Sequence, residues 1–254
     1  SSTAAAHNTY DATTRATLSG TAAVSELGSD SVSVIGAGAG SFADANAGSN
    51  KAVSVTGYTL TGVDAGNYDV VQPNAVSATI HKADVIVSGS KTYDGATSVA
   101  GSTLTATGVA GQTFSVTGAG DASNLSSKNV QSGAALASAT GLSLGSSSNG
   151  GLASNYNAIG VAGSSYTVTA KGITLTGISA LDKIYDATTT AALNTASVGY
   201  SGLINGDSVS LAGSGTGSFA TKNVGVNKAV TVSGYTLSGA DAGNYVVIQP
   251  TGLT

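Results

Sequence analysis

A short motif that recurs at a domain-sized spacing constrains the fold of this chain more than any other feature. A Tyr-Asp pair, followed by Ala or Gly and then by Thr, stands at residues 8–14, 91–97 and 183–189. The interval is 83 residues from Tyr10 to Tyr93 and 92 residues from Tyr93 to Tyr185. Solenoid and propeller units are shorter, at roughly 20 to 50 residues. The spacing therefore predicts a tandem array of small domains.

A second block follows each motif in the same order and sets the domain boundaries. It consists of Tyr-Thr-Leu and then Asp-Ala-Gly-Asn-Tyr at residues 58–68 and again at 235–245, whereas the middle copy keeps only Leu-Ser-Leu at 142–144 and Asn-Tyr at 155–156. We therefore predict three domains. Their ranges are 1–82 (incomplete at its amino-terminal end), 83–171 (divergent, with an insertion) and 172–254 (incomplete at its carboxy-terminal end).

Composition excludes several classes of protein. Charged residues make up 9% of the chain, against about 25% in an average globular protein, so Ser, Thr, Asn and Gly must supply the surface polarity. Only nine residues are basic and the net charge is −4, so a nucleic-acid footprint is missing. No apolar run is long enough to span a membrane. The absence of cysteine excludes disulfides, thiolate metal sites and cysteine nucleophiles.

Strand signals are clear and helical periodicity is absent. Residues 31–35, 113–116 and 208–211 alternate apolar with polar side chains, each after a Gly-containing turn, which predicts the same hairpin in three domains. Gly57, Gly141 and Gly234 stand at one place inside a strand pattern, which indicates a bulge or a switch between sheets. We predict an all-β chain of three Ig-like antiparallel β-sandwiches. Because the linkers at 81–83 and 170–172 are short, we expect a semi-rigid rod.

The repeated residues favour structural roles. In each Tyr-Asp motif we expect the Tyr to pack in the core and the Asp to accept backbone hydrogen bonds in an Asx-type turn. The Asp-x-Gly-x-Tyr pattern is similar to a tyrosine corner, in which the Tyr hydroxyl bonds back to the backbone. A ligand or metal site is the alternative for both motifs. The predicted structural residues are Tyr10, Asp11, Tyr93, Asp94, Tyr185, Asp186, Asp64, Gly66, Tyr68, Asp241, Gly243 and Tyr245.

Other candidate sites carry weak signals, so we predict no catalytic, cofactor-binding or metal-ligating residue. His7 and His81 are the only histidines, and no Gly-x-Ser-x-Gly elbow with a plausible His and Asp partner occurs. The Gly-rich stretches 36–40 and 213–217 are interpreted as mobile loops rather than phosphate cradles. Three alternatives stay open: calcium at the domain joints, a Lys–Asn isopeptide crosslink at 128–129 or 222–223, and glycosylation at Asn124.

The blocks together support a family resemblance. The Lys-x-Tyr-Asp-Gly/Ala-x-Thr block, the Gly-Asp-x-Val-Ser-Leu hairpin and the Asp-Ala-Gly-Asn-Tyr block resemble the YDG and MBG repeat domains of large secreted bacterial adhesins, namely filamentous-haemagglutinin-like exoproteins exported by two-partner secretion. The likeness covers nearly the whole chain and implies a repetitive β stalk at the bacterial cell surface. No ligand-binding residues carry over from it.

The resemblance leads to a functional expectation. We expect a non-enzymatic stalk segment of a surface adhesin, which serves attachment or biofilm cohesion by extending or packing a rod. Its partners would be neighbouring repeats of the same polypeptide, with self-association or polysaccharide binding as further options. The alternative is a carbohydrate-binding module for exopolysaccharide or host glycan, which would need exposed aromatic side chains beside polar ones.

Overall fold

The computed structural model describes residues 3–254 and divides the chain into two compact units. The first unit runs to Ser88 and includes residues 100–120 and 139–164; the second comprises residues 89–99, 121–138 and 165–254. The division falls inside the predicted middle domain rather than at residues 82 or 171. Contacts across each predicted domain joint therefore lie within one unit. The boundaries of the three predicted domains stay a prediction.

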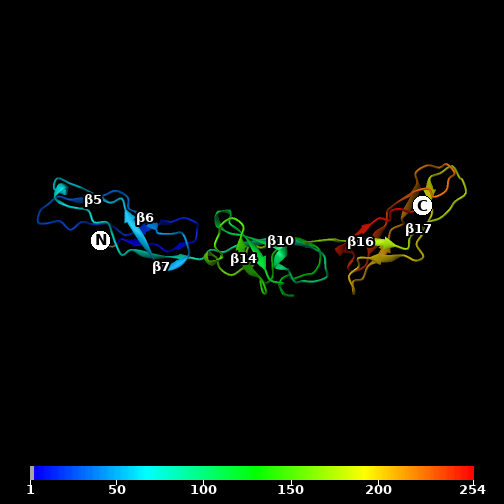
Figure 1. The fold of residues 1–254 in the computed structure, drawn as a ribbon, viewed down its shortest axis with the longest axis horizontal. Helices are drawn as coiled ribbons and strands as arrows, with labels where there is room; N and C mark the ends of the chain where they lie inside the picture. Colours follow the sequence, from blue (N-terminus) through cyan, green and yellow to red (C-terminus); the bar gives the residue numbers. More distant parts are fainter. Residues whose placement is uncertain (1–2) are drawn as a thin grey trace. The chain divides into compact units, whose positions relative to one another are not determined.

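The first unit is built from short strands (Figure 1). Within residues 3–88 these are β1 (Ala4–Ala5), β2 (Asn8–Thr9), β3 (Arg15–Ala16), β4 (Leu18–Ser19), β5 (Ser33–Ile35), β6 (Ala39–Phe42), β7 (Gly48–Thr56), β8 (Thr59–Thr61) and β9 (Ser77–His81), with the 3₁₀ turn η1 (Ala65–Asn67). Its later segments hold η2 (Gly101–Thr103), β11 (Leu104–Thr107), η3 (Val109–Gly111), β12 (Thr113–Thr117), β14 (Ser143–Ser147) and η4 (Ala153–Asn155). Strand β10 (Ile86–Thr92) begins in this unit and ends in the other.

The second unit has the same character. It contains β13 (Gln131–Ala134), β15 (Ser165–Thr169), β16 (Lys171–Thr176), β17 (Ser179–Ala180), β18 (Thr190–Ala191), β19 (Leu193–Asn194), β20 (Gly199–Ser201), β21 (Ser210–Ala212), β22 (Thr216–Phe219), β23 (Val230–Ser233), β24 (Thr236–Ser238), η5 (Ala242–Asn244) and β25 (Tyr245–Ile248). Across residues 3–254 there is no α-helix. The prediction of an all-β chain is confirmed.

Part of the strand pairing recurs in the two units: β3-β6-β7 corresponds to β18-β22-β23, and β5-β8 corresponds to β21-β24. In the first unit the strand order is β2-β9-β7-β6-β3, with a separate pair β5-β8; in the second, β18-β22-β23 stands beside the pair β21-β24 and the sheet β20-β16-β25. Most pairs are antiparallel, but β2–β9 and β16–β25 are parallel. A parallel pair joins strands near the start and the end of a repeat, which sequence alternation does not reveal.

The core of the second unit lies between its sheets. Leu175 on β16 packs with Ala191, Val230 and Val232 on the β18-β22-β23 sheet, and Tyr235 closes the cluster. In β23 the buried residues alternate with exposed ones, as a strand with one face on a core requires. Several sheets that share a core in this way match the predicted sandwich architecture.

Fixed glycines mark where the chain changes sheet. Gly57 (φ +92°) separates β7 from β8, and Gly234 (φ +88°) separates β23 from β24, and in both cases the two strands belong to different sheets. A Cβ on Gly57 would lie 2.6 Å from the carbonyl oxygen of Ala37, so both φ and space demand glycine. Of the two predicted alternatives, a bulge or a switch, the switch is confirmed at Gly57 and Gly234, whereas the strands on either side of Gly141, β13 and β14, belong to one sheet.

The predicted hairpins are only partly correct. Strands β5, β12 and β21 form where alternation placed them, and each pairs with the equivalent Leu-centred strand: Val34 with Leu60, Val116 with Leu144 and Leu211 with Leu237. The turns that precede β5 and β21 do not close hairpins, however, because their ladders form with β8 and β24 further along the chain. Only β11 and β12 make a hairpin of the expected kind.

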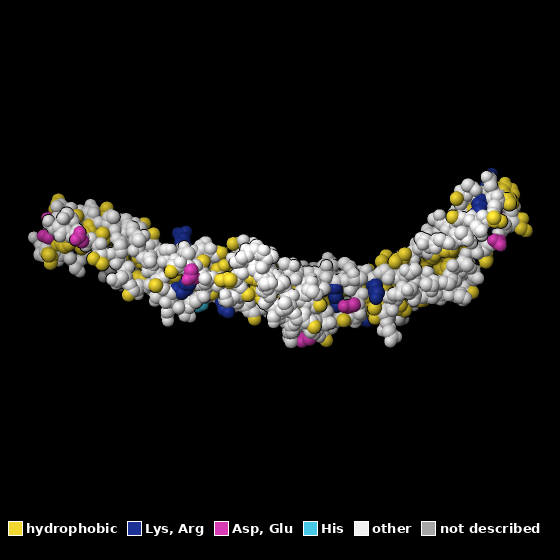
Figure 2. All heavy atoms as spheres, viewed as in Figure 1, with side chains coloured by type: hydrophobic (Ala, Val, Ile, Leu, Met, Phe, Trp, Pro, Cys, Tyr) yellow, Lys and Arg dark blue, Asp and Glu magenta, His cyan; other side chains and the backbone are white. Residues whose placement is uncertain are grey.

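The surface carries few charges. On the face shown in Figure 2, lysine, arginine and acidic side chains are sparse among polar uncharged and apolar ones. No helix in the described part of the chain is long and apolar enough to cross a membrane.

Candidate functional site

The three Tyr-Asp motifs form one type of turn. The Asp11 carboxylate accepts hydrogen bonds from the backbone N–H and the hydroxyl of Thr13, both at 2.8 Å. Asp186 does the same with Thr188, and Asp94 accepts the N–H of Ala96 at 2.9 Å. The residue after each Asp has a positive φ, at 66°, 76° and 64° for positions 12, 95 and 187. This is the geometry of an Asx-type turn, in which the carboxylate replaces a backbone acceptor.

Lysines support two of these turns. The ammonium group of Lys91 lies 2.9 Å from Asp94, and that of Lys183 lies 2.7 Å from Asp186. The hydrogen bond from Lys183, together with those from Thr188, lowers the pKa of the Asp186 carboxyl to about 2.

The Asp-x-Gly-x-Tyr corners fasten a turn far back in the same repeat. Asp64 accepts the backbone N–H of Ser31 at 2.8 Å, and Asp241 accepts that of Ser208 at 2.8 Å. The Tyr68 hydroxyl accepts the N–H of Leu27 at 2.9 Å. These bonds span 33 and 41 residues, so they are long-range clamps rather than the local bond of an immunoglobulin tyrosine corner.

All three corner tyrosines keep this bond. Tyr156 accepts the N–H of Val109 at 3.0 Å, and Tyr245 accepts that of Ile204 at 2.9 Å. The middle repeat therefore retains the hydrogen bond to its corner Tyr although it lacks the corner Asp. Gly66 and Gly243, which were also singled out in the sequence, have open space where a Cβ would stand.

Two of the three tyrosines in the Tyr-Asp motifs are buried, as predicted, and the third is exposed. Tyr10 is 5% exposed and Tyr93 is 1% exposed, but each ring packs edge-to-face against the corner tyrosine of the following repeat. Tyr185 is 54% exposed, so the prediction that it packs in a core is wrong. Tyr10 and Tyr93 are buried because the corner tyrosine of another repeat packs on each of them. No corner tyrosine packs on Tyr185 in the described structure.

We call the contact between a motif tyrosine and the corner tyrosine of the following repeat a joint. The first joint lies within the first unit and has no charged residue at its centre. The rings of Tyr10 and Tyr156 have centroids 5.5 Å apart and an interplanar angle of 80°. Phe114 also packs edge-to-face on the Tyr156 ring, with centroids 5.0 Å apart. Gln112 stands between the hydroxyls. Its amide nitrogen donates to the Tyr10 hydroxyl at 2.9 Å, and its amide oxygen accepts from the Tyr156 hydroxyl at 2.7 Å. Burial raises the pKa of Tyr156.

The second joint, within the second unit, has a charged centre. The rings of Tyr93 and Tyr245 have centroids 5.4 Å apart at 76°, and both hydroxyls donate to one oxygen of Asp207 at 2.7 Å. The ammonium group of Lys128 lies 2.8 Å from the other Asp207 oxygen and 3.7 Å from Asp241. The Asp207 side chain is 3% exposed, so its charge is held by hydrogen bonds rather than by water.

These contacts shift the titration of the second joint. Burial acts to raise the pKa of Asp207, but hydrogen bonds from Lys128, Tyr245 and Tyr93 hold it below the usual range. Burial, together with the adjacent Asp207 carboxylate, raises the pKa of Tyr245 to about 12. The hydrogen bond to Asp207 raises the pKa of Lys128. At neutral pH, the carboxylate is therefore ionised and both phenols are protonated.

A buried asparagine completes each joint. In the first unit Asn155 accepts the backbone N–H of Ala47 at 3.0 Å and donates to the Asn46 side chain at 3.0 Å.

In the second unit Asn244 accepts the N–H of Val130 at 2.9 Å and donates to the Asn129 side chain at 3.1 Å. The two pairs of bonds use the same atoms at equivalent positions. We call each pair an Asn clamp.

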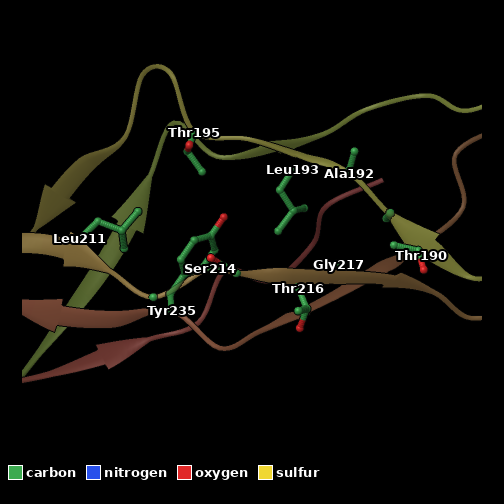
Figure 3. Close-up of a pocket in the computed structure, with 12 residues that line it drawn as sticks. Thr190, Ala192, Leu193, Thr195, Leu211, Ser214, Thr216, Gly217 and Tyr235 are labelled. Carbon is green, nitrogen blue, oxygen red and sulfur yellow. The ribbon is translucent and has the colours of Figure 1, made fainter.

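A cleft of about 420 Å³ lies in the second unit beside Tyr235. Figure 3 shows the Tyr235 side chain between Leu211 and Leu193, with Thr195, Ser214 and Thr216 around the opening. The Gly-rich stretch 213–217 forms one wall. A Cβ on Gly215 would lie 2.1 Å from the Tyr235 ring, and one on Gly38 would lie 2.4 Å from Tyr58. Residues 36–38 and 213–215 connect strands, as predicted for loops, and they pack closely on aromatic rings; their mobility stays a prediction.

The remaining candidate sites gain no support as ligand sites. Asn124 is fully buried, and its amide nitrogen donates to the carbonyl of Ser138 at 3.1 Å, so the sequon is inaccessible in this fold. The His7 and His81 rings pack edge-to-face, and His7 accepts the backbone N–H of Thr79. Within residues 3–254, no group of three or more His, Asp or Glu side chains is placed to hold a metal ion.

Comparison with known families agrees with this geometry. A model of the YDG domain matches residues 1–78 and 169–252, which together make up more than half of the chain and correspond to the first and third repeats. The chain belongs to the YDG domain family. The middle repeat falls outside the match, in keeping with its loss of the corner Asp. Searches of curated proteins and of solved structures returned no significant match.

Sequence reasoning missed the residues at the centre of each joint. Gln112, Asp207, Asn155 and Asn244 belong to repeated positions, but their partners lie more than 35 residues away. One signal was available: a polar residue recurs after the turn glycine as Asp30, Gln112 and Asp207 in the three repeats.

Proposed function

We propose that this chain is a structural segment of a large secreted bacterial adhesin, in which successive YDG domains form a stalk that serves attachment or biofilm cohesion. The observation that carries the proposal is that one joint is built twice. The same edge-to-face tyrosine pair and the same Asn clamp recur between different repeats. A repeat-to-repeat contact that keeps the same ring pair and the same asparagine hydrogen bonds is the feature that a serial scaffold needs.

The chemistry of the joints supports a mechanical role. Each joint combines buried aromatic rings with hydrogen bonds to backbone groups, so relative motion of the joined repeats would leave polar groups unpaired at a cost of about 1–3 kcal/mol each. Membership of the YDG family and the low charge of the chain are consistent with a secreted repeat protein. We expect no catalytic activity.

Small-angle scattering tests the scaffold proposal. We expect an elongated particle whose dimensions do not change with calcium. Replacing both clamps, Asn155→Ala with Asn244→Ala, should broaden the distribution of interatomic distances. Asn67→Ala is the matched control, because Asn67 occupies the same corner position but is exposed. A compact particle, or an equal response to all three substitutions, would contradict the proposal.

A second measurement tests the location. Antibodies raised against the chain should label intact cells of the source organism without permeabilisation. Labelling only after permeabilisation would remove the surface assignment while leaving the scaffold proposal standing.

A carbohydrate-binding role is the second candidate, and the cleft beside Tyr235 favours it. Hydroxyl groups of Thr195, Ser214 and Thr216 line this cleft together with Tyr235, and a few polar groups of this kind can orient a sugar, although the Tyr235 ring is only 4% exposed. Titration calorimetry with exopolysaccharide fragments tests this role. We expect Tyr235→Phe to weaken binding without unfolding the repeat. If no fragment binds the chain at millimolar concentration, this candidate is wrong.

A further inference from the structure

The third repeat presents, uncovered, the same groups that the first two repeats use in their joints. Tyr185 is the equivalent of Tyr10 and Tyr93, Asn223 that of Asn46 and Asn129, and position 224 that of Ala47 and Val130. In the third repeat these residues are exposed, with 54% of Tyr185 and 87% of Val224 accessible. No hydrogen bond from the Val224 N–H or from the Asn223 side chain is present within the described residues.

These groups line a single hollow. A cavity of about 690 Å³ is bounded by Ile184, Tyr185, Asn223, Val224 and Val226 among its lining residues. Ile184 is 91% exposed and Val226 is 90% exposed. An open concave face of this kind, with several large apolar side chains in contact with water, is typical of a docking surface.

The uncovered face is more apolar than the two covered ones. The position of Ile184 is Thr9 and Thr92 in the other repeats.

The position of Val226 is Ser49 and Ser132. If such a face already binds a corner when these positions are polar, the third repeat offers additional apolar area to the same occupant.

We propose that this face binds the Asn-Tyr corner of another YDG domain. The corner Asn would accept the Val224 N–H and donate to the Asn223 side chain, and the corner Tyr ring would pack edge-to-face on Tyr185. Both contacts copy those of Asn244 and Tyr245 in the second joint. The inference deepens the proposed scaffold function, on which it rests, by naming the partner of this surface.

The chain itself carries a corner of the required form. Asn67 is exposed, and the Tyr68 hydroxyl donates to Asp30 at 2.8 Å while it accepts the N–H of Leu27. Tyr245 has the same two partners in Ile204 and Asp207, and there Asp207 also accepts the hydroxyl of the incoming Tyr93. Asp30 is therefore placed to accept the hydroxyl of an incoming Tyr185.

An extended chain tests the proposal in the arrangement of the existing joints. A second copy of residues 78–171 is fused after Thr254. The fusion keeps the register, because Leu253 accepts the N–H of Val230 at 2.9 Å just as Val76 accepts that of Val53 at 2.8 Å. The copy supplies the strand equivalent to β9 and then the corner of Asn155 and Tyr156. Relative to the unextended chain, we expect hydrogen exchange at the Val224 amide to slow by at least about tenfold and nitration of Tyr185 to decrease.

Two matched chains separate the corner from the strand. One carries only residues 78–82 after Thr254, and the other carries the full copy with Asn155→Ala in the appended part. Protection of Val224 by the full copy alone supports the proposal. Equal protection in the short chain, or in the variant, overturns it. So does a folded appended copy, shown by its circular dichroism, that leaves Val224 and Tyr185 accessible.

The unextended chain decides the matter if the appended copy does not fold. At the millimolar concentration that a short linker would provide, head-to-tail contact should shift the nuclear magnetic resonance signal of the Val224 amide, and Asn67→Ala should abolish the shift. No shift at that concentration overturns the proposal. Scattering by the unextended chain reports on the two existing joints, so failure here leaves the proposed scaffold function separately testable.

Discussion

The two joints share a frame and differ in their centre. Each has an edge-to-face tyrosine pair and an Asn clamp, but Gln112 joins the hydroxyls in the first and Asp207 in the second. Lys128 adds an ammonium group to the second joint only. The equivalent of Lys128 in the first repeat is Ala45, so the first joint lacks the ammonium group as well as the carboxylate.

This difference indicates which parts of the joint set its geometry and which set its response to conditions. The rings and clamps recur unchanged, so they define how one repeat meets the next. The polar centre accepts a neutral amide or an ion pair in the same place. The second joint should therefore respond to acid and to salt through its charged centre, whereas the first joint has a neutral centre that neither acid nor salt changes.

Removing a joint tyrosine should have the largest effect and should not distinguish the joints. Tyr156→Ala and Tyr245→Ala each delete a buried ring together with its bond to a backbone N–H, so we expect each to lower the free energy of unfolding by about 3–5 kcal/mol. Denaturant unfolding followed by circular dichroism measures the change.

Tyr68→Ala provides the matched control for these two substitutions. Tyr68 holds the same corner bond, but its ring is only half-buried and no motif tyrosine packs on it in the described structure. We expect a clearly smaller loss. Equal losses at all three positions would show that the tyrosines act within their own repeats rather than through the joints.

Replacing the centre should separate the joints. Asp207→Ala leaves two buried hydroxyls and an ammonium group without their acceptor, so we expect a loss of about 2–4 kcal/mol. Gln112→Ala removes a neutral amide, and about 1–2 kcal/mol should be lost. Unfolding curves of both variants measure the difference. A Gln112→Ala loss as large as that of Asp207→Ala would contradict the idea that charge strengthens the second joint.

Much of the fold was predictable because its signals are local. Alternation in residues 113–116 gives β12, and glycine at 57 and 234 marks the sheet switches, since a positive φ is a property of a single residue. The Asx-type turns at Asp11 and Asp186 follow from an Asp and a Thr two positions apart, and in the middle motif Ala96 takes the place of that Thr. The parallel pairs β2–β9 and β16–β25 could not be predicted, because each joins segments more than 70 residues apart.

The candidate site was predictable only in its residue types. The sequence identified Tyr93 and Tyr245 as repeated, but nothing local states that one ring packs on the other across 152 residues. The exposure of Tyr185 shows why the interpretation failed. A residue that looks like a core tyrosine in its own repeat is buried only when a neighbouring repeat supplies the other half of the contact.

Acid should weaken the second joint and spare the first. The pKa of Asp207 is lower in the folded chain than its ordinary 3.8, so its stabilising contribution is present above pH 3.8 and is lost as the pH falls through the lower folded value. Amide signals of Val130 and Ala47, followed through acid titrations in moderate denaturant, measure the two joints separately. Asp207→Asn should remove the acid-dependent loss at Val130. Asp44, whose pKa is lowered by hydrogen bonds from Lys51 and from the N–H of Asn46, lies beside the first clamp, so the titration is repeated with Asp44→Asn. Parallel loss at Ala47 in that variant would contradict a neutral first joint.

Alkali should weaken the second joint as well. The pKa of Tyr245 rises from 10.0 to about 12 on folding, so stabilisation by its protonated form is present below pH 10 and is lost as the pH rises from 10 to about 12. The pKa of Tyr156 is also raised, so both joints should share this alkaline limb. The absorbance of ionised tyrosine at high pH measures it. A difference between the joints in alkali, without one in acid, would reverse the assignment of the charged centre.

Salt should produce the smallest effect, and it isolates the ammonium group. Lys128 is 38% exposed in its side chain, so its pairing with Asp207 is partly screened by solvent, and Lys128→Gln should lower the free energy of unfolding by less than Asp207→Ala does. The native chain should lose a similar amount at the Val130 amide between low and high salt, whereas the variant should show no such loss. Lys128→Gln removes the ammonium group alone, because Asp207 still accepts hydrogen bonds from both tyrosine hydroxyls in the variant. A salt response that survives Lys128→Gln would place the sensitive charge elsewhere, and Asp241, 3.7 Å from the same ammonium group, would be the residue to replace next.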